Sequence, residues 1–315
     1  MSEKIKNACV YGIGGVGGYF GGIISNKLME VSRGMQVFYV GRGKHLEEIQ
    51  KHGLHLITDK ATFRCIPNIA TNKVRHMPTP DIYLLCVKSY DLEGALRSIA
   101  KNIHKDTIIL PLLNGVDIYE RIRSRLKQGI VLPACVYISS SIIMPGTVRQ
   151  RGPAGHIIFG KDPYYPDRKY PALTLFFKQM GISHTWSQNP YSAIWTKYVF
   201  IAAFSLITAY SGKTIGEVLS NKKLKQMTES VMQEVVLAGK AKQVDFDRDI
   251  IEKTIRKAGE FPYETKTSFQ RDFEKKNAKN EGDIFGGSLM RLAKEYNIPI
   301  PVIVGVHKVL MAGKI

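Results

Sequence analysis

The sequence predicts an α/β N-terminal domain followed by an all-α C-terminal domain. Three observations carry this prediction. A glycine-rich turn stands between a strand-like and a helix-like run within the first 22 residues. Strand-like apolar runs then alternate with helix-like stretches as far as Met180, which is typical of parallel βαβ units. Beyond Ser187-Gln-Asn-Pro190 only helical patterns follow, so we expect domains at residues 1–187 and 188–315.

The glycine-rich turn has the spacing of a dinucleotide-binding loop. It consists of Gly12, Ile13, Gly14, Gly15, Val16 and Gly17. In such a loop the first glycine permits a tight turn, the second lets the backbone approach a pyrophosphate, and the last lets the helix pack closely on the sheet. The N–H groups at the helix start would face the phosphates. Since this loop directly follows a strand and opens a helix, we predict a Rossmann-type domain with these six residues at the cofactor.

The end of the second strand indicates which dinucleotide is bound. Gln36-Val-Phe-Tyr-Val40 is followed by Gly41-Arg42-Gly43-Lys44, where an NAD site tends to have an acid for the ribose 2′-hydroxyl. The two cations suit a 2′-phosphate, because a guanidinium can bind it through two hydrogen bonds. The alternative is that Arg42 and Lys44 are solvated cations at the start of the next helix. We predict NADPH rather than NADH, with Arg42 at the 2′-phosphate.

Two further buried strands end in polar residues. Asp81–Val87 is followed by Lys88, and Thr107–Leu113 by Asn114 and Gly115. The carboxyl ends of parallel strands form the edge at which ligands bind in open α/β sheets. By themselves, Lys88 could be a surface lysine and Asn114 a turn former. The rest of this domain should contain short strands within residues 55–68, strands at 131–138 and 156–159, a proline-rich loop at 162–171 and a last helix at 173–180.

The first helix of the second domain, residues 191–210, is apolar nearly all round and should be buried. Lys197 lies inside it, on one face with Ile201, Ser205 and Thr208. An unpaired buried ammonium is costly, so the lysine must either extend to solvent or meet a partner. If this face lines a cleft, Lys197 can serve as a proton donor.

The remaining helices show no evident chemistry. We expect helices at 222–242 and 247–259, a solvated charge-rich stretch from Arg271 to Glu281, a helix N-capped by Asp283 and running to Tyr296, and a short terminal helix after Pro301.

Composition narrows the class of protein. The formal net charge is +18, but no arginine-rich arm or nucleic-acid motif accompanies it, so anionic small molecules are the expected partners. The four cysteines have no metal-ligand spacing and suit a reduced compartment. The first residues lack the apolar core of a signal peptide, and the longest apolar run, 198–209, is too short to span a bilayer. We expect a cytoplasmic protein with no metal and no membrane or nucleic-acid partner.

Several motifs, in their order and spacing, resemble the ketopantoate reductase (2-dehydropantoate 2-reductase) family. The resemblance covers nearly the whole chain and rests on GIGGVGGYFGG at 12–22, VGRG at 40–43, LCVKSYD at 85–91, LLNGVD at 112–117, WTKYVF at 195–200, ITA at 207–209, TSF at 267–269 and NEGD at 280–283. It implies a Rossmann-type domain with an all-α, 6-phosphogluconate-dehydrogenase-like second domain. It also implies an enzyme of pantothenate and coenzyme A biosynthesis. The sequence does not fix the oligomeric state, and a homodimer is one possible assembly.

The resemblance also implies roles for particular residues. Lys197 is implied as the general acid and Glu281 as its carboxylate partner. Ser268 is implied at the substrate carboxylate, and Lys88 and Asn114 at the nicotinamide and the substrate. NADPH would then deliver hydride to the ketone carbon of a 2-oxo acid in a cleft between the domains, while Lys197 protonates the forming alkoxide.

The chain departs from the family pattern on the substrate side. The family commonly has asparagines four and eight residues after the lysine, where this sequence has Ile201 and Ser205. Ser205 and Thr208 remain as possible substrate contacts on this face. We therefore expect reduction of ketopantoate to pantoate with relaxed selectivity. The alternatives are a reductase of a more apolar 2-oxo acid and an NADPH-sensing protein without turnover.

Overall fold

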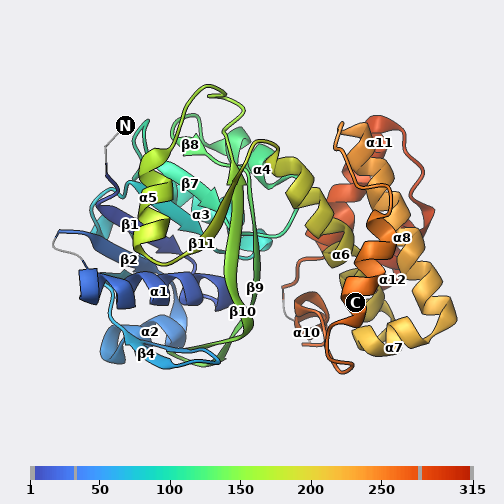
Figure 1. Ribbon diagram of the computed structural model, residues 1–315, viewed down its shortest axis with the longest axis horizontal. Helices are drawn as coiled ribbons and strands as arrows, with labels where there is room; N and C mark the ends of the chain where they lie inside the picture. The colour runs from blue at the N-terminus through green and yellow to red at the C-terminus, as the bar shows by residue number, and fades with distance from the viewer. Residues whose placement is uncertain (1–3, 32–33, 276–278, 313–315) are drawn as a thin grey trace. The chain divides into compact units, whose positions relative to one another are not determined.

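The computed structural model describes residues 4–31, 34–275 and 279–312, and the chain forms two compact units (Figure 1). The first comprises residues 1–113 and 118–190, and the second comprises residues 114–117 and 191–315. The second unit thus includes the four residues from Asn114 to Asp117, which follow a strand of the first.

The first unit is built on a parallel six-stranded sheet in the order β5-β2-β1-β6-β7-β8. Its strands are β1 (Asn7–Tyr11), β2 (Gln36–Val40), β5 (Ile69–Thr71), β6 (Ile82–Leu85), β7 (Ile108–Pro111) and β8 (Ile130–Val131). The helices of its crossovers are α1 (Gly15–Val31), α2 (Gly43–His52), α3 (Leu92–Ile99) and α4 (Ile118–Arg125). The continuous apolar strands are buried, as expected for a sheet covered on both faces.

The three central strands end level with one another. Tyr11 of β1 pairs with both Val40 of β2 and Leu85 of β6. The glycine-rich loop, Arg42 and Lys88 therefore all follow strands at the same edge of the sheet, where the cofactor is expected.

A second sheet, not expected from the sequence, completes the first unit. It contains β3 (Leu54–Ile57), β4 (Thr62–Cys65), β9 (Ala134–Met144), β10 (Thr147–Gly160) and β11 (Ser183–Ser187). The expectation that strands end before Met180 is wrong, because β11 follows α5 (Pro171–Gln179) and pairs parallel with β10. Its sequence, SHTWS, is short and polar, so no apolar alternation marks it.

The glycines of α1 allow that helix to pack against both sheets. A Cβ on Gly21 would lie 2.9 Å from the Tyr39 ring of β2. A Cβ on Gly18 would lie 2.5 Å from Val148 of β10, and one on Gly22 would lie 2.9 Å from Leu56 of β3. The repeated glycine pairs after the loop are thus explained by close packing on two sides of the helix.

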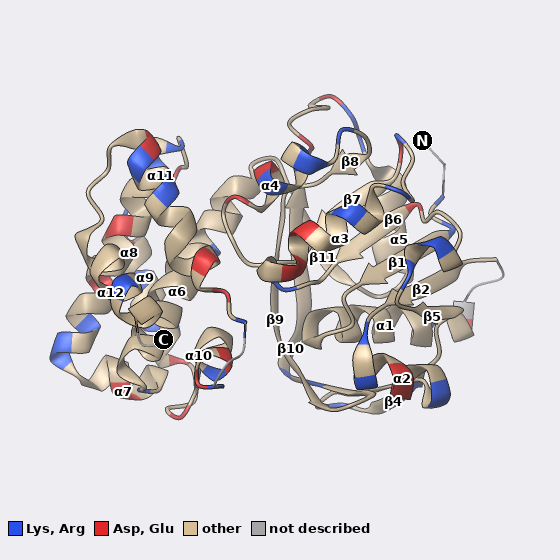
Figure 2. Cartoon of the chain, turned by 180° about the vertical axis from the view of Figure 1, so that it is seen from behind, with Lys and Arg blue, Asp and Glu red and all other residues tan. Residues whose placement is uncertain are grey.

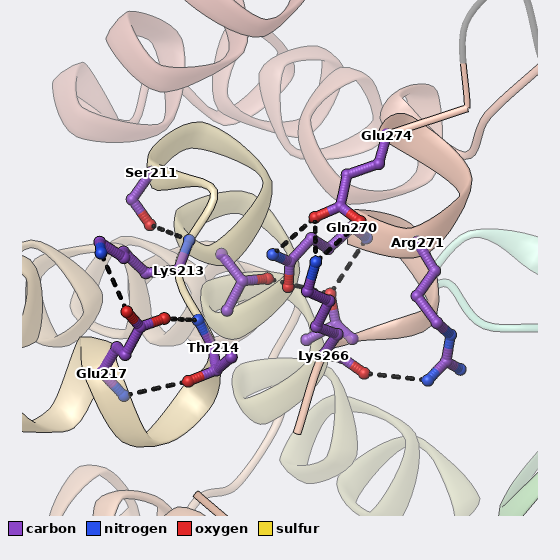
Figure 3. Close-up of polar contacts among 10 residues, drawn as sticks. Ser211, Lys213, Thr214, Glu217, Lys266, Gln270, Arg271 and Glu274 are labelled. Carbon is purple, nitrogen blue, oxygen red and sulfur yellow. Dashed lines mark hydrogen bonds and ion pairs between the residues drawn. The ribbon is translucent and has the colours of Figure 1, made fainter. Parts of the chain in front are cut away.

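The described elements of the second unit are helical. They are α6 (Pro190–Ser211), α7 (Ile215–Ser220), α8 (Lys222–Ala241), α9 (Ile250–Gly259), α10 (Ser268–Phe273), the π-helical turn η3 (Asp283–Gly287), α11 (Ser288–Tyr296) and α12 (Pro301–Ala312). The Rossmann-type domain followed by an all-α domain is confirmed. Helix α7 was not predicted from the sequence, although a capping box between Thr214 and Glu217 marks its start (Figure 3).

Helix α6 is longer than its apolar core suggested. The apolar run 198–209 alone is too short for a bilayer, but the helix that contains it has 22 residues and is apolar enough to span one. In its most apolar window 61% of the residues are buried inside the protein. The all-round apolar character of α6 therefore reflects its position in a protein core.

Asp283 does not N-cap a helix, contrary to the sequence prediction. The backbone is already helical at Gly282, and no side chain caps η3. The carboxylate instead accepts hydrogen bonds from the Arg291 guanidinium of α11, the shorter at 2.7 Å. Asp283 lies within the π-turn rather than before it, so its carboxylate is not at a capping position. The exposed carboxylate binds the Arg291 guanidinium instead.

Basic side chains are spread over many elements of each unit and are interspersed with acidic ones (Figure 2). This distribution fits the expectation from the sequence that the charge of +18 does not come from one basic segment.

Candidate functional site

The glycine-rich loop has the local geometry expected of a phosphate-binding turn. Gly12 has φ +96°, and a Cβ on Gly17 would lie 2.0 Å from the Gly12 carbonyl oxygen. Both positions therefore require glycine for reasons internal to the protein. A Cβ on Gly14 would meet nothing within 4 Å. Protein packing does not explain this glycine, whereas the approach of a pyrophosphate to the backbone would.

The first turn of α1 leaves its N–H groups available to an anion. The helix begins at Gly15 and has no acidic residue in its first turn. Val16 and Gly17 lie in this turn, and Ile13 is buried at the end of the loop. The donors and the helix dipole therefore fit a dinucleotide pyrophosphate.

Arg42 lies at the N-cap position of α2 and its side chain is 77% exposed. Its guanidinium forms an ion pair with Asp91, with Nη2 and Oδ2 2.5 Å apart. Arg42 is therefore exposed, as a solvated cation would be, but its guanidinium is already paired with a carboxylate. Lys44 is exposed in the first turn of α2.

Lys88 is half-buried and begins the 3₁₀ turn η2 (Ser89–Asp91) directly after β6. The carboxyl-edge position predicted for it is therefore present, in the first unit. Asn114 follows β7 in the same way, but it belongs to the second unit. Gly115 has φ +131°, a conformation that allows the chain to turn immediately after Asn114.

Lys197 is half-buried on α6, and its ammonium donates a 2.7 Å hydrogen bond to Oδ1 of Asn114. The lysine therefore meets a polar partner rather than only extending to solvent. The helix around it is held rigidly, because Trp195 and Tyr198 are buried and their rings pack edge to face. Gly239 of α8 leaves room for Trp195, since a Cβ there would lie 2.9 Å from the indole.

The other face residues of α6 do not all have the role expected. Ser205 is 3% exposed and Thr208 is fully buried. The Thr208 hydroxyl lies 2.6 Å from the Phe204 carbonyl and 3.0 Å from the Thr267 hydroxyl. Its hydrogen-bonding capacity thus serves the protein, and the idea that Thr208 replaces a lost substrate contact is not supported by this geometry.

Thr208 instead positions the segment that contains Ser268. Thr267 N-caps α10 by accepting a hydrogen bond from the Gln270 N–H, and Ser268 is the exposed first residue of this helix. Lys266 and Gln270 both donate to Glu274, which anchors the helix on its other side (Figure 3).

Glu281 is 3% exposed, so the expectation of a solvated surface from Arg271 to Glu281 is wrong at its last residue. Residues 276–278 of that stretch lie outside the described residues. The Glu281 carbonyl accepts hydrogen bonds from the N–H groups of Ile284 and Phe285, which starts the π-turn. π-Turns are frequent at functional sites.

Two contacts connect this turn to the rest of the second unit. The Tyr198 hydroxyl, one residue after the candidate acid, donates to the carbonyl of Ile284. The Phe285 ring packs against Phe269, which follows Ser268, with centroids 5.2 Å apart. Helix α6 therefore organises three candidate segments of its unit: Asn114, the Thr267–Ser268 cap and the turn after Glu281.

Burial changes the chemistry of three of the four cysteines. Burial raises the pKa of Cys65 to about 12 and also raises the pKa values of Cys9 and Cys86. Such thiols are poor nucleophiles and poor metal ligands. Among the described residues, no group of three His, Cys, Asp or Glu side chains could hold a metal ion.

Three residues that shape the site were not expected from the sequence: Asp91, Tyr198 and Thr267. Asp91 lies in the LCVKSYD motif, but nothing in the spacing revealed that it pairs with Arg42. Tyr198 and Thr267 appeared only as members of apolar and small-residue motifs. Their signal was a polar group at a position that the pattern predicts to be buried, since such groups need partners.

The fold and the glycine loop define a pyridine-nucleotide-dependent oxidoreductase. Family models of ketopantoate reductase match both halves: PanE/ApbA over residues 8–163 and its C-terminal part over residues 189–314. The chain belongs to the ketopantoate reductase family.

The chain is similar to individual relatives and to solved structures over nearly its whole length. The chain is 26% identical over 298 residues to the uncharacterized oxidoreductase YkpB of Bacillus subtilis, covering 95% of each. It is 27% identical to a 2-dehydropantoate 2-reductase of known structure from Porphyromonas gingivalis, with a TM-score of 0.83 over 98% of this chain and 100% of the other. A ternary structure of D-mandelate dehydrogenase with NADH and anilino(oxo)acetate has the same fold, with 19% identity, a TM-score of 0.85 and 98% coverage of both chains.

Proposed function

We propose that the protein reduces ketopantoate to pantoate with NADPH, with Lys197 as the general acid. The substrate is a 2-oxo acid with a carboxylate, a ketone, a gem-dimethyl carbon and a terminal hydroxyl. The nicotinamide cofactor supplies the hydride for the ketone carbon. The protein must bind both molecules, orient the ketone and supply a proton to its oxygen.

The observation that carries this proposal is the hydrogen bond from Lys197 Nζ to Asn114 Oδ1. A primary ammonium carries three N–H donors, and Asn114 accepts one of them. Such a donor stabilises negative charge as it develops on the ketone oxygen and can then transfer the proton. Asn114 would orient the ammonium, and its own amide N–H groups would remain available to a substrate oxygen.

The other residues have supporting roles in the proposal. Glu281 is the buried carboxylate that serves as the partner of Lys197, and Ser268, an exposed residue, binds the substrate carboxylate. In the first unit, the glycine loop and α1 hold the pyrophosphate, Arg42 the 2′-phosphate and Lys88 the nicotinamide end.

Ile201 and Ser205 favour a second candidate, a more apolar 2-oxo acid. Ile201 lies one turn after Lys197, is half-buried and cannot form a hydrogen bond. The D-mandelate dehydrogenase of the same fold, solved with anilino(oxo)acetate, is a precedent for an apolar group next to the 2-oxo acid. Under this candidate the reaction and its acid are unchanged, and only the substrate side chain differs.

The test is NADPH oxidation across a panel of 2-oxo acids that includes ketopantoate, its analogue without the hydroxyl, and phenylglyoxylate. Turnover of ketopantoate above all others supports the main proposal, and turnover of the apolar acids supports the second. NADPH binding without oxidation of any acid indicates an NADPH-sensing protein. The free thiols fit a reducing compartment, and we propose the cytoplasm as the place of action.

A further inference from the structure

The ion pair between Arg42 and Asp91 lies where the cofactor's 2′-substituent is expected. Arg42 follows β2 and Asp91 follows β6, and these strands flank β1 on either side. Because all three strands end level, the pair joins the two neighbours of the glycine loop at one edge of the sheet.

The Asp91 carboxylate forms this pair instead of capping a helix. It occupies the N-cap position of α3, where an aspartate ordinarily accepts hydrogen bonds from the first helical N–H groups. No side-chain cap bond is present, and the carboxylate, 23% exposed, contacts the Arg42 guanidinium. The backbone at Asp91 is already helical, with φ −101° and ψ −5°, which turns the side chain away from those donors.

We propose that Asp91 is a specificity-determining residue that sets the preference between NADPH and NADH. The proposal rests on the proposed function only in requiring a pyridine dinucleotide on the glycine loop. A 2′-phosphate must displace the carboxylate from Arg42 and then lie beside a like charge, so Asp91 weakens NADPH binding. A ribose with a free 2′-hydroxyl instead finds a carboxylate acceptor, which the end of β2 does not provide.

The charge environment allows one carboxylate to have this effect. Arg42 and Lys44 are the cations that precede and open α2, and both are exposed. Asp91 is the acid paired with Arg42, whereas Glu93 on the same helix α3 pairs with Arg97 and Arg125. Glu93 is therefore a matched control for the loss of one negative charge from this part of the fold.

The experiment measures the affinities of adenosine 2′,5′-bisphosphate and 5′-AMP by titration calorimetry. These probes differ only in the 2′-phosphate and need no turnover. The proteins are the wild type, Asp91→Asn, Glu93→Gln, Arg42→Ala and the Arg42→Ala/Asp91→Asn double variant. We expect Asp91→Asn to bind the bisphosphate roughly three- to tenfold more tightly and 5′-AMP roughly two- to fivefold more weakly, while Glu93→Gln matches the wild type.

The double variant tests whether Asp91 acts through Arg42. Without the guanidinium there is nothing for the phosphate to displace, so the gain for the bisphosphate should be reduced to the loss of like-charge repulsion. Equal changes for both probes in Asp91→Asn, or weaker binding of the bisphosphate, would overturn the proposal. The second of these results would make Asp91 a residue that positions Arg42. Failure of the wild type to bind either probe would overturn both this inference and the proposed function, whereas binding without an Asp91 effect overturns the inference alone.

Discussion

Arg42 is the residue on which the proposed choice of cofactor depends. Its guanidinium is exposed and already paired with a carboxylate, so a phosphate can reach it by exchanging one anion for another. The surface location keeps the cost of this exchange small, because exposed ion pairs contribute little.

Replacing Arg42 by alanine should weaken NADPH binding roughly ten- to hundredfold, the usual effect of losing a charge-assisted hydrogen bond. NADH binding should change little, because a 2′-hydroxyl does not need the cation. Lys51→Ala, an exposed lysine in the last turn of the same helix, is the control for charge. Calorimetric titration with both cofactors decides the matter, and equal losses for NADPH and NADH would remove Arg42 from the 2′-phosphate site.

At this scale the sequence predicted residue types well and partners poorly. The missing acid after β2 and the cation in its place were visible as a pattern. The pairing of Arg42 with Asp91 depends on two strands that flank a third, and no local spacing reveals it. Likewise, Glu281 appeared solvated because its neighbours are charged, whereas the π-turn places it in the protein interior.

At the scale of elements, α6 connects to α10 through one hydroxyl pair. Thr208→Val keeps the shape of the side chain and removes its contact with Thr267. The Thr267–Ser268 cap should then be less well positioned, which raises KM for the 2-oxo acid several-fold with a smaller effect on kcat. Both parameters come from steady-state NADPH oxidation.

Thr228→Val is the matched control, because Thr228 is a buried threonine of α8 that makes the same bond to a carbonyl four residues earlier. Each variant should lose about 1 kcal/mol of unfolding free energy. An unchanged KM in Thr208→Val, or an equal change in Thr228→Val, would show that the hydroxyl pair has only a structural role.

A carboxylate of α8 accepts hydrogen bonds from the first turn of helix α12. Glu234 is 6% exposed and accepts 2.8 Å hydrogen bonds from the N–H groups of Val302 and Ile303. Burial raises the pKa of Glu234 above its usual value, and these two bonds only partly offset that effect. As pH rises, the unfolded chain therefore loses this proton before the folded protein does.

The wild type should consequently lose stability relative to Glu234→Gln as pH rises from below the ordinary glutamate pKa through the raised folded value. Below that range the glutamine variant should have nearly the same stability, since protonated glutamate and glutamine are both neutral. Urea unfolding at several pH values measures the difference, with exposed Glu252→Gln on α9 as the control. A difference that does not change with pH contradicts this account.

For the whole molecule, the division into an α/β and an all-α unit was predictable because each has its own periodicity. The second sheet was not, because β11 is polar, and the later part of β9 and the middle of β10 are exposed. The pairing of Asn114 with Lys197 also required the structure, since the two residues lie 83 positions apart.

Selectivity for the substrate hydroxyl tests how the departures at Ile201 and Ser205 affect function. A site built to bind a hydroxyl rejects the analogue that lacks it by about 10⁴-fold or more, whereas an apolar site discriminates by only about 1–3 kcal/mol per methylene. We expect kcat/KM for ketopantoate to exceed that of the analogue by less than 10⁴-fold. A larger ratio would mean that the hydroxyl site is intact, and a preference for the analogue would favour the apolar 2-oxo acid.

The central claim is that Lys197 supplies the proton, and kcat of Lys197→Ala measured with saturating NADPH and ketopantoate tests it most directly. We predict a decrease of about 10²–10⁴ with NADPH affinity preserved, and normal turnover in Lys223→Ala, an exposed lysine of α8. Glu281→Gln should also slow turnover, and its effect should not add to that of Lys197→Ala if the two act as a unit. A Lys197→Ala protein with near-normal kcat would contradict the account.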